Sequence, residues 1–111
     1  MHLYVELWNA RPEWLALSKE ERGNYAAQLG PAIGALLEKG IELVGFALND
    51  EDAPLRGDYR YIAVWQMPRA ELAHQLEEVV EKAGWHKYFE QINARGEIIS
   101  PPDALGDMVN L

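Results

Sequence analysis

The first residues of the chain alternate between two kinds of side chain. In HLYVELWN (2–9), Leu, Val and Leu alternate with Tyr, Glu and Trp. A period of two predicts a strand over 2–9, and both of its faces carry large apolar groups. The acid in this pattern, Glu6, stands between two aromatic residues on one face. A strand that only packs does not need a carboxylate there, so Glu6 is the first candidate for chemistry.

A capping box predicts the start of the first long helix. Ser18 is followed three residues later by Glu21, so we expect a helix from about Lys19. Gly40 predicts where this helix ends. The Gly-Pro pair at 30–31 is expected to divide or kink the helix, because proline cannot donate a backbone hydrogen bond.

The rest of the chain continues with strand and helix patterns. Apolar residues at helical spacing predict a second helix over 69–83 and a short one over 85–91. Alternating or apolar runs predict three more strands, at 41–48, 59–67 and 95–100.

The order βαββαβ predicts an α+β, ferredoxin-like single domain over 1–111, an antiparallel sheet with helices on one face. The other face would be bare, although the strands are apolar on both sides. A homodimer that packs sheet against sheet would cover it. We expect this interface at five aliphatic residues: Leu3, Val5, Leu7, Ile62 and Val64. The tail, 101–111, is too apolar to stay uncovered and is expected to lie on the same subunit or on a partner.

Three stretches resemble the dimeric α+β barrel superfamily: HLYVELW as first strand, YRYIAVWQM as third strand, and GWHKYFEQ after the second long helix. In the last stretch, His86 and Phe89 resemble a His-x-x-Phe segment that these families often carry. The resemblance covers residues 2–100 and extends to antibiotic-biosynthesis monooxygenases and to stress-responsive barrel proteins with their polyketide cyclases. The stretches GFAxNDED, DYRYIAVW and GWHxYFEQ are also similar to a small bacterial family.

This resemblance implies a ligand pocket inside each subunit, between the helices and the sheet. The pocket would receive the mixed aromatic and polar face of the first strand and one face of the third strand. Such a set suits a small-molecule cavity. The residues placed towards the pocket are His2, Tyr4, Glu6, Trp8, Tyr61, Ala63 and Trp65.

Glu6 and His86 are the candidate catalytic residues. Desolvation among aromatic rings would raise the pKa of Glu6 towards neutrality, where a carboxyl group can act as general acid or base. The alternative is an acid that only hydrogen-bonds to a tyrosine or the backbone, or reaches solvent. The resemblance implies that His86 moves a proton or polarises a carbonyl, with His2 across the cavity. The alternatives are a surface or capping role for His86 and an ordinary near-terminal role for His2.

The candidate ligand-binding residues are mostly aromatic. A box of rings could stack around a flat apolar ligand, and Phe89 could cover the mouth of the pocket or anchor the short helix. For each ring, plain core packing is the alternative. The residues of the box are Trp8, Tyr25, Tyr61 and Trp65.

The composition argues against several kinds of binding partner and site. The 111 residues carry a net charge of −8 with no basic run, so neither nucleic acid nor an anionic membrane is an expected partner. The absence of cysteine removes disulfides, thiolate nucleophiles and zinc–thiolate sites. No apolar stretch reaches about 18 residues and no signal-peptide pattern opens the chain, so we expect a cytoplasmic protein.

Neither a metal nor an organic cofactor is expected. The sequence has no close pair of ligand histidines such as H-x-x-x-H. Haem-degrading members of the superfamily use an Asn on the first strand, a Trp and a helical His. Here Asn9 has the opposite parity to the pocket face, and Glu90 or Gln91 replaces the histidine.

The leading hypothesis is a cofactor-independent acid–base enzyme, an isomerase, cyclase or monooxygenase, that acts on a small aromatic or enol-type ligand. The second is a non-catalytic ligand-binding or stress-related barrel protein, and the third is a structural dimer with a filled core. An open cavity at Glu6 and His86 would favour the first two hypotheses.

Overall fold

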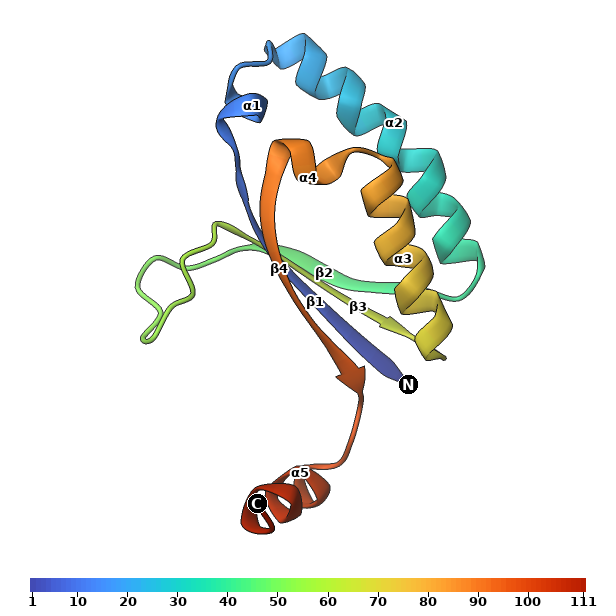
Figure 1. Cartoon of the computed structure of the whole chain (residues 1–111), viewed down its shortest axis with the longest axis vertical. Helices are drawn as coiled ribbons and strands as arrows, with labels where there is room; N and C mark the ends of the chain where they lie inside the picture. Colours follow the sequence, from blue (N-terminus) through green and yellow to red (C-terminus); the bar gives the residue numbers. More distant parts are fainter.

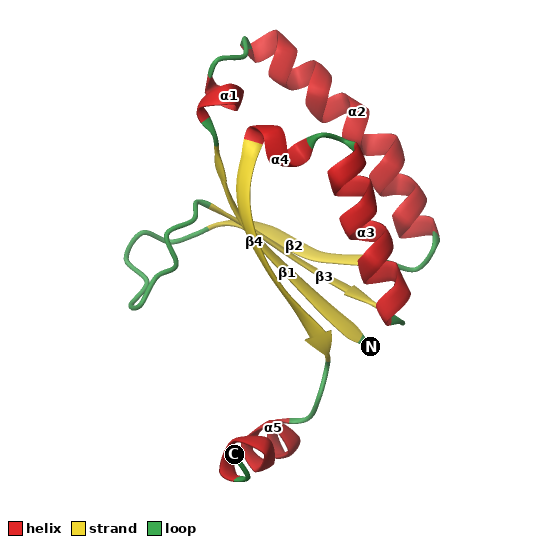
Figure 2. Cartoon of the chain, in the orientation of Figure 1, coloured by secondary structure: helices red, strands yellow, loops and turns green.

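A single four-stranded antiparallel sheet forms the body of the protein, as the computed structural model of residues 1–111 describes it. The strand order is β2-β3-β1-β4, which is the ferredoxin-like order that the sequence predicts. Helices α2 and α3 lie side by side over one face of the sheet, and α4 closes one end (Figure 1, Figure 2). The elements are β1 (His2–Ala10), α1 (Pro12–Leu15), α2 (Lys19–Glu38), β2 (Glu42–Leu48), β3 (Tyr61–Met67), α3 (Ala70–Lys82), α4 (Trp85–Tyr88), β4 (Phe89–Glu97) and α5 (Pro101–Val109).

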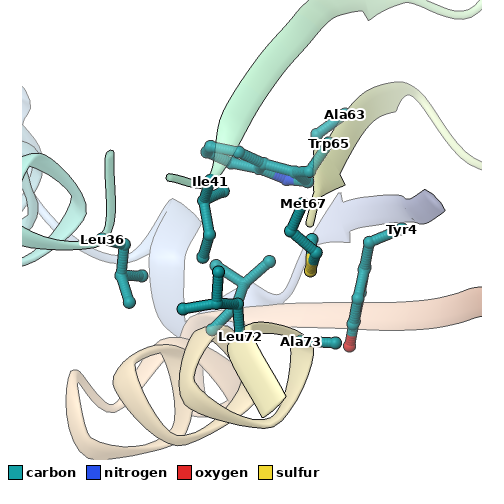
Figure 3. Close-up of a cluster of buried hydrophobic side chains, with 9 residues drawn as sticks. Tyr4, Leu36, Ile41, Ala63, Trp65, Met67, Leu72 and Ala73 are labelled. Atoms are coloured by element: carbon teal, nitrogen blue, oxygen red, sulfur yellow. The ribbon is translucent and has the colours of Figure 1, made fainter. Parts of the chain in front are cut away.

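The core lies between the inner face of the sheet and the two long helices. Alternate residues of β1 and β3 point to this side, and α3 contributes a leucine-rich face that contacts them. Figure 3 shows these side chains gathered between sheet and helices. The buried cluster comprises Tyr4, Leu36, Ile41, Ala63, Trp65, Met67, Leu72, Ala73 and Leu76.

The outer face of the sheet carries the aliphatic half of the strand pattern. Val5 pairs with Val64 and Leu7 with Ile62 on adjacent strands, so these side chains form one continuous apolar surface. No helix of the chain covers it (Figure 1). The division of β1 into a helix-facing and an open half is the one that its period of two predicts.

Helix α2 begins at the expected capping box, where Ser18 and Glu21 exchange side-chain and backbone hydrogen bonds. The expected division of this helix at residues 30–31 is wrong, because α2 continues past Pro31 as one helix. A proline in a helix interior costs about 3 kcal/mol. The residues that follow it include Ile33 and Leu36, which pack on the core. Full burial of such a side chain is worth roughly 1.5–3 kcal/mol, so this packing counters that cost.

The fourth strand begins earlier than the sequence predicts. Strand β4 starts at Phe89 rather than at residue 95, and α4 ends at Tyr88 rather than at residue 91. Every residue from Phe89 to Glu97 pairs with β1. These residues include Asn and Gly, which have poor strand propensity, so pairing with β1 overrides local preference. Gln91, which was expected in the short helix, and Asn93, which was expected in a loop, therefore lie on the sheet.

The tail after β4 folds into α5, whose start is capped by the Ser100 hydroxyl. Figure 1 shows α5 standing apart from the sheet and from all other helices. Neither α5 nor any other helix combines the length and apolarity that crossing a membrane requires.

Candidate functional site

Glu6 lies in the middle of β1, on the face that the helices cover, and only 7% of its surface is exposed. Both of its oxygens accept hydrogen bonds. Trp65 Nε1, on the neighbouring strand β3, donates to Oε1 at 2.6 Å. Gln91 Nε2, on the other neighbour β4, donates to Oε2 at 2.8 Å. The carboxylate is therefore held from both sides by its flanking strands.

The same environment shifts the pKa of Glu6. Burial raises this pKa, because a charged carboxylate loses hydration. The hydrogen bonds from Trp65 and Gln91 and the nearby charge of His86 act in the opposite direction, but the raised pKa remains. Glu6 is therefore an acid whose protonated form persists to higher pH than that of an exposed glutamate.

An apolar cavity of about 360 Å³ opens beside Glu6, between the sheet and helices α2 and α3. This volume falls in the range of small-molecule pockets. Glu6 is the only charged residue in its lining, and the tryptophans Trp8, Trp65 and Trp85 supply most of its aromatic surface. The space between the sheet and the helices is thus not completely filled in the single chain, which favours the two hypotheses that need a ligand pocket.

Two glycines of α2 account for part of the open space. Gly30 and Gly34 lie one turn apart and both line the cavity. A Cβ atom placed on either would meet no other atom within 4 Å. The lack of side chains at these positions leaves room that leucine or isoleucine would occupy.

A second, polar hollow of about 140 Å³ adjoins the other side of Glu6. His86 of α4 and Gln91 of β4 line it, together with the carboxylates of Glu77 and Glu81 on α3. Glu6 belongs to the lining of both spaces. It is the acidic group between an apolar cavity and a polar hollow.

Tyr4 also lines the polar hollow. Its hydroxyl donates to Glu77 Oε2 at 2.8 Å, and Arg95 Nε donates to the same oxygen at 2.8 Å. Burial and the hydrogen bond to Glu77 raise the pKa of Tyr4 well above its usual range. Tyr4 therefore stays neutral and serves as a hydrogen-bond donor.

The structure brings five of the nine residues selected from the sequence to these two spaces. They are Tyr4, Glu6, Trp8, Trp65 and His86. Their catalytic and binding roles stay predictions.

The other four lie outside both spaces. The His2 ring bonds to Glu97 Oε2 at 2.9 Å, at the opposite end of β1 from Trp8, so it does not face His86. Tyr25 donates to the carbonyl of Ala83 at 2.7 Å and lies against other helix residues. Tyr61 stacks on the ring of Trp8, with ring centroids 5.5 Å apart.

Phe89 is buried under α1 and α4 rather than at the cavity mouth. Its ring stacks on Trp85 at 4.1 Å and contacts Trp14 at 4.8 Å. Phe89 thus packs against Trp85, which lines the cavity and begins the short helix α4. Anchoring this helix is one of the two roles that the sequence left open for Phe89.

Several residues of the site were missed from the sequence, and two of them contact the selected residues directly. Gln91 joins Glu6 to the rim, because its Oε1 accepts a hydrogen bond from Trp85 Nε1 at 2.7 Å. Phe46 of β2 lines the apolar cavity and contacts both Trp8 and Trp65 edge-on. The position of Phe46 in an apolar strand was a usable signal, whereas Gln91 was hidden by its assignment to a helix.

The residues present do not fit haem or a metal ion. No histidine lines the apolar cavity, and His86 lines only the small polar hollow. His74 lies exposed on α3, 3.6 Å from a Glu77 oxygen. No group of three or more His, Asp or Glu residues is arranged to hold a metal.

The fold and the cavity together define a ferredoxin-like α+β protein with a ligand-sized pocket. The chain belongs to the family of unknown function DUF6616, whose model matches residues 1–111. No match was found among curated proteins.

Solved structures show where this fold recurs. The chain is similar to TA0507, provisionally called a chlorite dismutase, with a TM-score of 0.66 and 17% identity over 96% of this chain and 48% of that one. It is similar to the chlorite dismutase of Candidatus Nitrospira defluvii, with a TM-score of 0.65 and 20% identity over 96% of this chain and 43% of that one. The chain is also similar to RPA0582 of Rhodopseudomonas palustris, a protein of unknown function. The TM-score is 0.58 and the identity 17%, over 90% of this chain and 82% of that one. The chain thus spans about half the length of the two chlorite dismutase chains. At these identities the likeness shows the fold alone.

Proposed function

We propose that this protein is a cofactor-independent acid–base enzyme, an isomerase, cyclase or monooxygenase, for a small aromatic or enol-type ligand. One observation carries the proposal: Glu6, an acid with a raised pKa, lies between an apolar cavity and a polar hollow. A general acid or base works best when its pKa approaches the pH at which it operates. Burial moves Glu6 in that direction.

The apolar cavity and the polar hollow would have different roles in such a reaction. The apolar cavity holds the ligand body against Trp8, Trp65 and Phe46, whose rings favour a flat partner. Glu6 takes a proton from the ligand or gives one to it. The polar hollow with His86 exchanges that proton with solvent on the far side of Glu6.

The polarity of the cavity narrows the ligand class. A ligand with several charges would leave them unpaired, because Glu6 is the only charged residue in the lining. A ligand with an apolar body and one exchangeable proton meets the site better. An enol, a phenol or the acidic carbon next to a carbonyl satisfies this description.

Hydrogen–deuterium exchange tests this proposal without knowledge of the full reaction. A panel of phenols and 1,3-dicarbonyl compounds is first screened by thermal shift, and hits are confirmed by their loss in Trp65→Ala. NMR in D₂O then follows exchange of the acidic C–H of each bound dicarbonyl compound. We expect Glu6→Gln to bind the hit but to slow exchange by ~10²–10⁴-fold. Equal exchange rates in both proteins would contradict the proposed role of Glu6.

A non-catalytic ligand-binding protein is the second candidate. Both Glu6 oxygens already accept strong hydrogen bonds from Trp65 and Gln91. A carboxylate held in this way can orient a ligand without taking its proton. Binding of a hit that undergoes no exchange in the wild-type protein favours this candidate.

We also propose that the protein works as a homodimer through the outer face of the sheet. The chain exposes 7654 Å², whereas a folded monomer of this mass exposes roughly 6,200 Å². The excess is larger than the roughly 800 Å² that each partner contributes to an ordinary stable interface. A second copy packed on the outer face accounts for it. The residues of this proposed interface are Leu3, Val5, Leu7, Ile62 and Val64.

A further inference from the structure

Helix α5 has one clearly apolar side. At 100° per residue, Ala104, Leu105, Met108 and Val109 point to one half of the helix. The charged and amide residues Asp103, Asp107 and Asn110 occupy the other half. The apolar half is open to solvent in the single chain, since Met108 is 64% and Val109 83% exposed.

A nine-residue helix of this kind needs a cover to persist. Isolated helices shorter than about 12–15 residues are marginal in water. The Ser100 cap supports only the first turn, where its hydroxyl accepts from the Asp103 amide. The stability of α5 must therefore come from packing of its apolar side.

The chain itself does not provide that cover. Strand β4 ends at Glu97, opposite His2, and only residues 98–100 connect it to α5. Figure 1 shows α5 beyond this end of the sheet, on the side away from α2 and α3. The radius of gyration is 16.1 Å, whereas a compact domain of this length has roughly 13 Å. The molecule is extended, with α5 as its outlying part.

A second copy of the chain meets the requirements of both uncovered surfaces. The outer face of the sheet needs an apolar partner, and α5 projects towards the space that a copy packed on this face would occupy. In a two-fold dimer each chain gives one α5 and receives one, so both helices are covered at once. An anionic membrane is a poor alternative, since α5 carries two aspartates and no basic residue.

We propose that α5 is an exchanged arm whose apolar side packs on a second copy of this chain. The proposal rests on the homodimer proposed above and is independent of the chemistry of Glu6. The arm extends the sheet-to-sheet interface past the end of β4.

Sedimentation equilibrium tests the arm with a matched pair of variants. Leu105→Asp changes the charge by one unit on the apolar side of α5, and Asp107→Asn changes it by one unit on the polar side. We expect Leu105→Asp to raise the dimer dissociation constant at least tenfold, since each dimer loses two buried leucines. Asp107→Asn should change it less than twofold. A wild-type dimer whose dissociation constant is the same in Leu105→Asp would refute the arm but leave the sheet interface standing, whereas a wild-type monomer would refute both.

A spin label shows whether the contact is between copies. The chain has no cysteine, so Met108→Cys can carry a nitroxide at a single site. This labelled protein, without nitrogen-15, is mixed with nitrogen-15-labelled wild-type protein. Broadening of sheet amides in the wild-type copies, absent after reduction of the nitroxide, is expected. Failure of any wild-type signal to broaden in a mixture that forms dimers would overturn the proposal.

Discussion

Opposing effects act on the carboxyl group of Glu6. Its burial raises the pKa, while donors on β3 and β4 stabilise the ionised form. Each unit of pKa shift corresponds to about 1.4 kcal/mol of preference for one protonation state. The protein therefore gives up some stability at neutral pH to keep this acid in the cavity.

The pH dependence of stability makes this cost measurable. With a folded-state pKa raised above the unfolded value of about 4.3, Glu6 contributes stability that is fully present below pH ~4 and is lost as the pH rises through the folded pKa. In Glu6→Gln that loss is absent. Urea unfolding at pH 4 and pH 8 should show wild type weakening relative to Glu6→Gln as the pH rises. A gap between the two proteins that does not change, or that moves the other way, would contradict the raised pKa.

Of the groups at the Glu6 carboxylate, Glu6 and Trp65 could be found from the sequence, but the second donor, Gln91, could not. The alternation in β1 predicts which side chains share a face with Glu6, and this needs no tertiary information. Gln91 could not be assigned in the same way, because its orientation depends on where β4 begins. That boundary is set by pairing with β1 rather than by local propensity. The prediction for His2 failed for a different reason. The alternation of β1 puts His2 on the same face as Glu6, but it lies at the end of the strand away from the pocket and pairs with Glu97.

Helix α2 shows how one pattern can have two meanings. The Gly-Pro pair at 30–31 is a strong breaker signal, yet the helix continues because its second half packs on the core. Gly30 and Gly34 are better explained by the cavity that they line. The volume of a cavity depends on how separate elements pack, so the sequence alone did not predict it.

A substitution in α2 tests this explanation of the glycines. Gly34→Leu places a side chain at the cavity lining, where its Cβ would meet no other atom within 4 Å. Gly23→Leu makes the same change at an exposed position of the same helix. We expect both variants to be as stable as wild type or more so, by up to ~1 kcal/mol, because leucine favours helix.

Only the variant that fills the cavity should affect binding. Calorimetric titration with a ligand from the thermal-shift screen should show at least tenfold weaker binding to Gly34→Leu and unchanged binding to Gly23→Leu. Equal affinities would mean that the ligand occupies another site.

At the scale of the whole molecule, the single chain leaves many large apolar side chains exposed, among them Leu3, Leu105 and Met108. The ferredoxin-like order followed from the succession of patterns, and the open outer face followed from strands that are apolar on both sides. The position of α5 did not follow. Its residues predict that it needs a cover, but the direction in which it leaves β4 is decided by a three-residue connection.

A charge on the outer face should separate the proposed dimer. Val64→Asp puts a carboxylate at the centre of this face, where it would be buried without a partner. Leu55→Asp is the control, since Leu55 is fully exposed at the tip of the β2–β3 loop. Its backbone is left-handed, with φ of 57°, which aspartate tolerates better than leucine does. Light scattering should show a monomer for Val64→Asp and a dimer for Leu55→Asp. A dimer in both would mean that the interface lies elsewhere.

The protonation of Glu6 is the point on which the proposed chemistry depends most. Carbon-13 NMR of the glutamate side-chain carboxyl groups, with Glu6→Gln to assign the signal, gives its pKa in the folded protein directly. We expect a titration midpoint above the ordinary glutamate value of about 4.3. A midpoint at or below that value would contradict it, because Glu6 would then be a fixed carboxylate that holds Trp65 and Gln91 rather than a group that exchanges protons with a ligand.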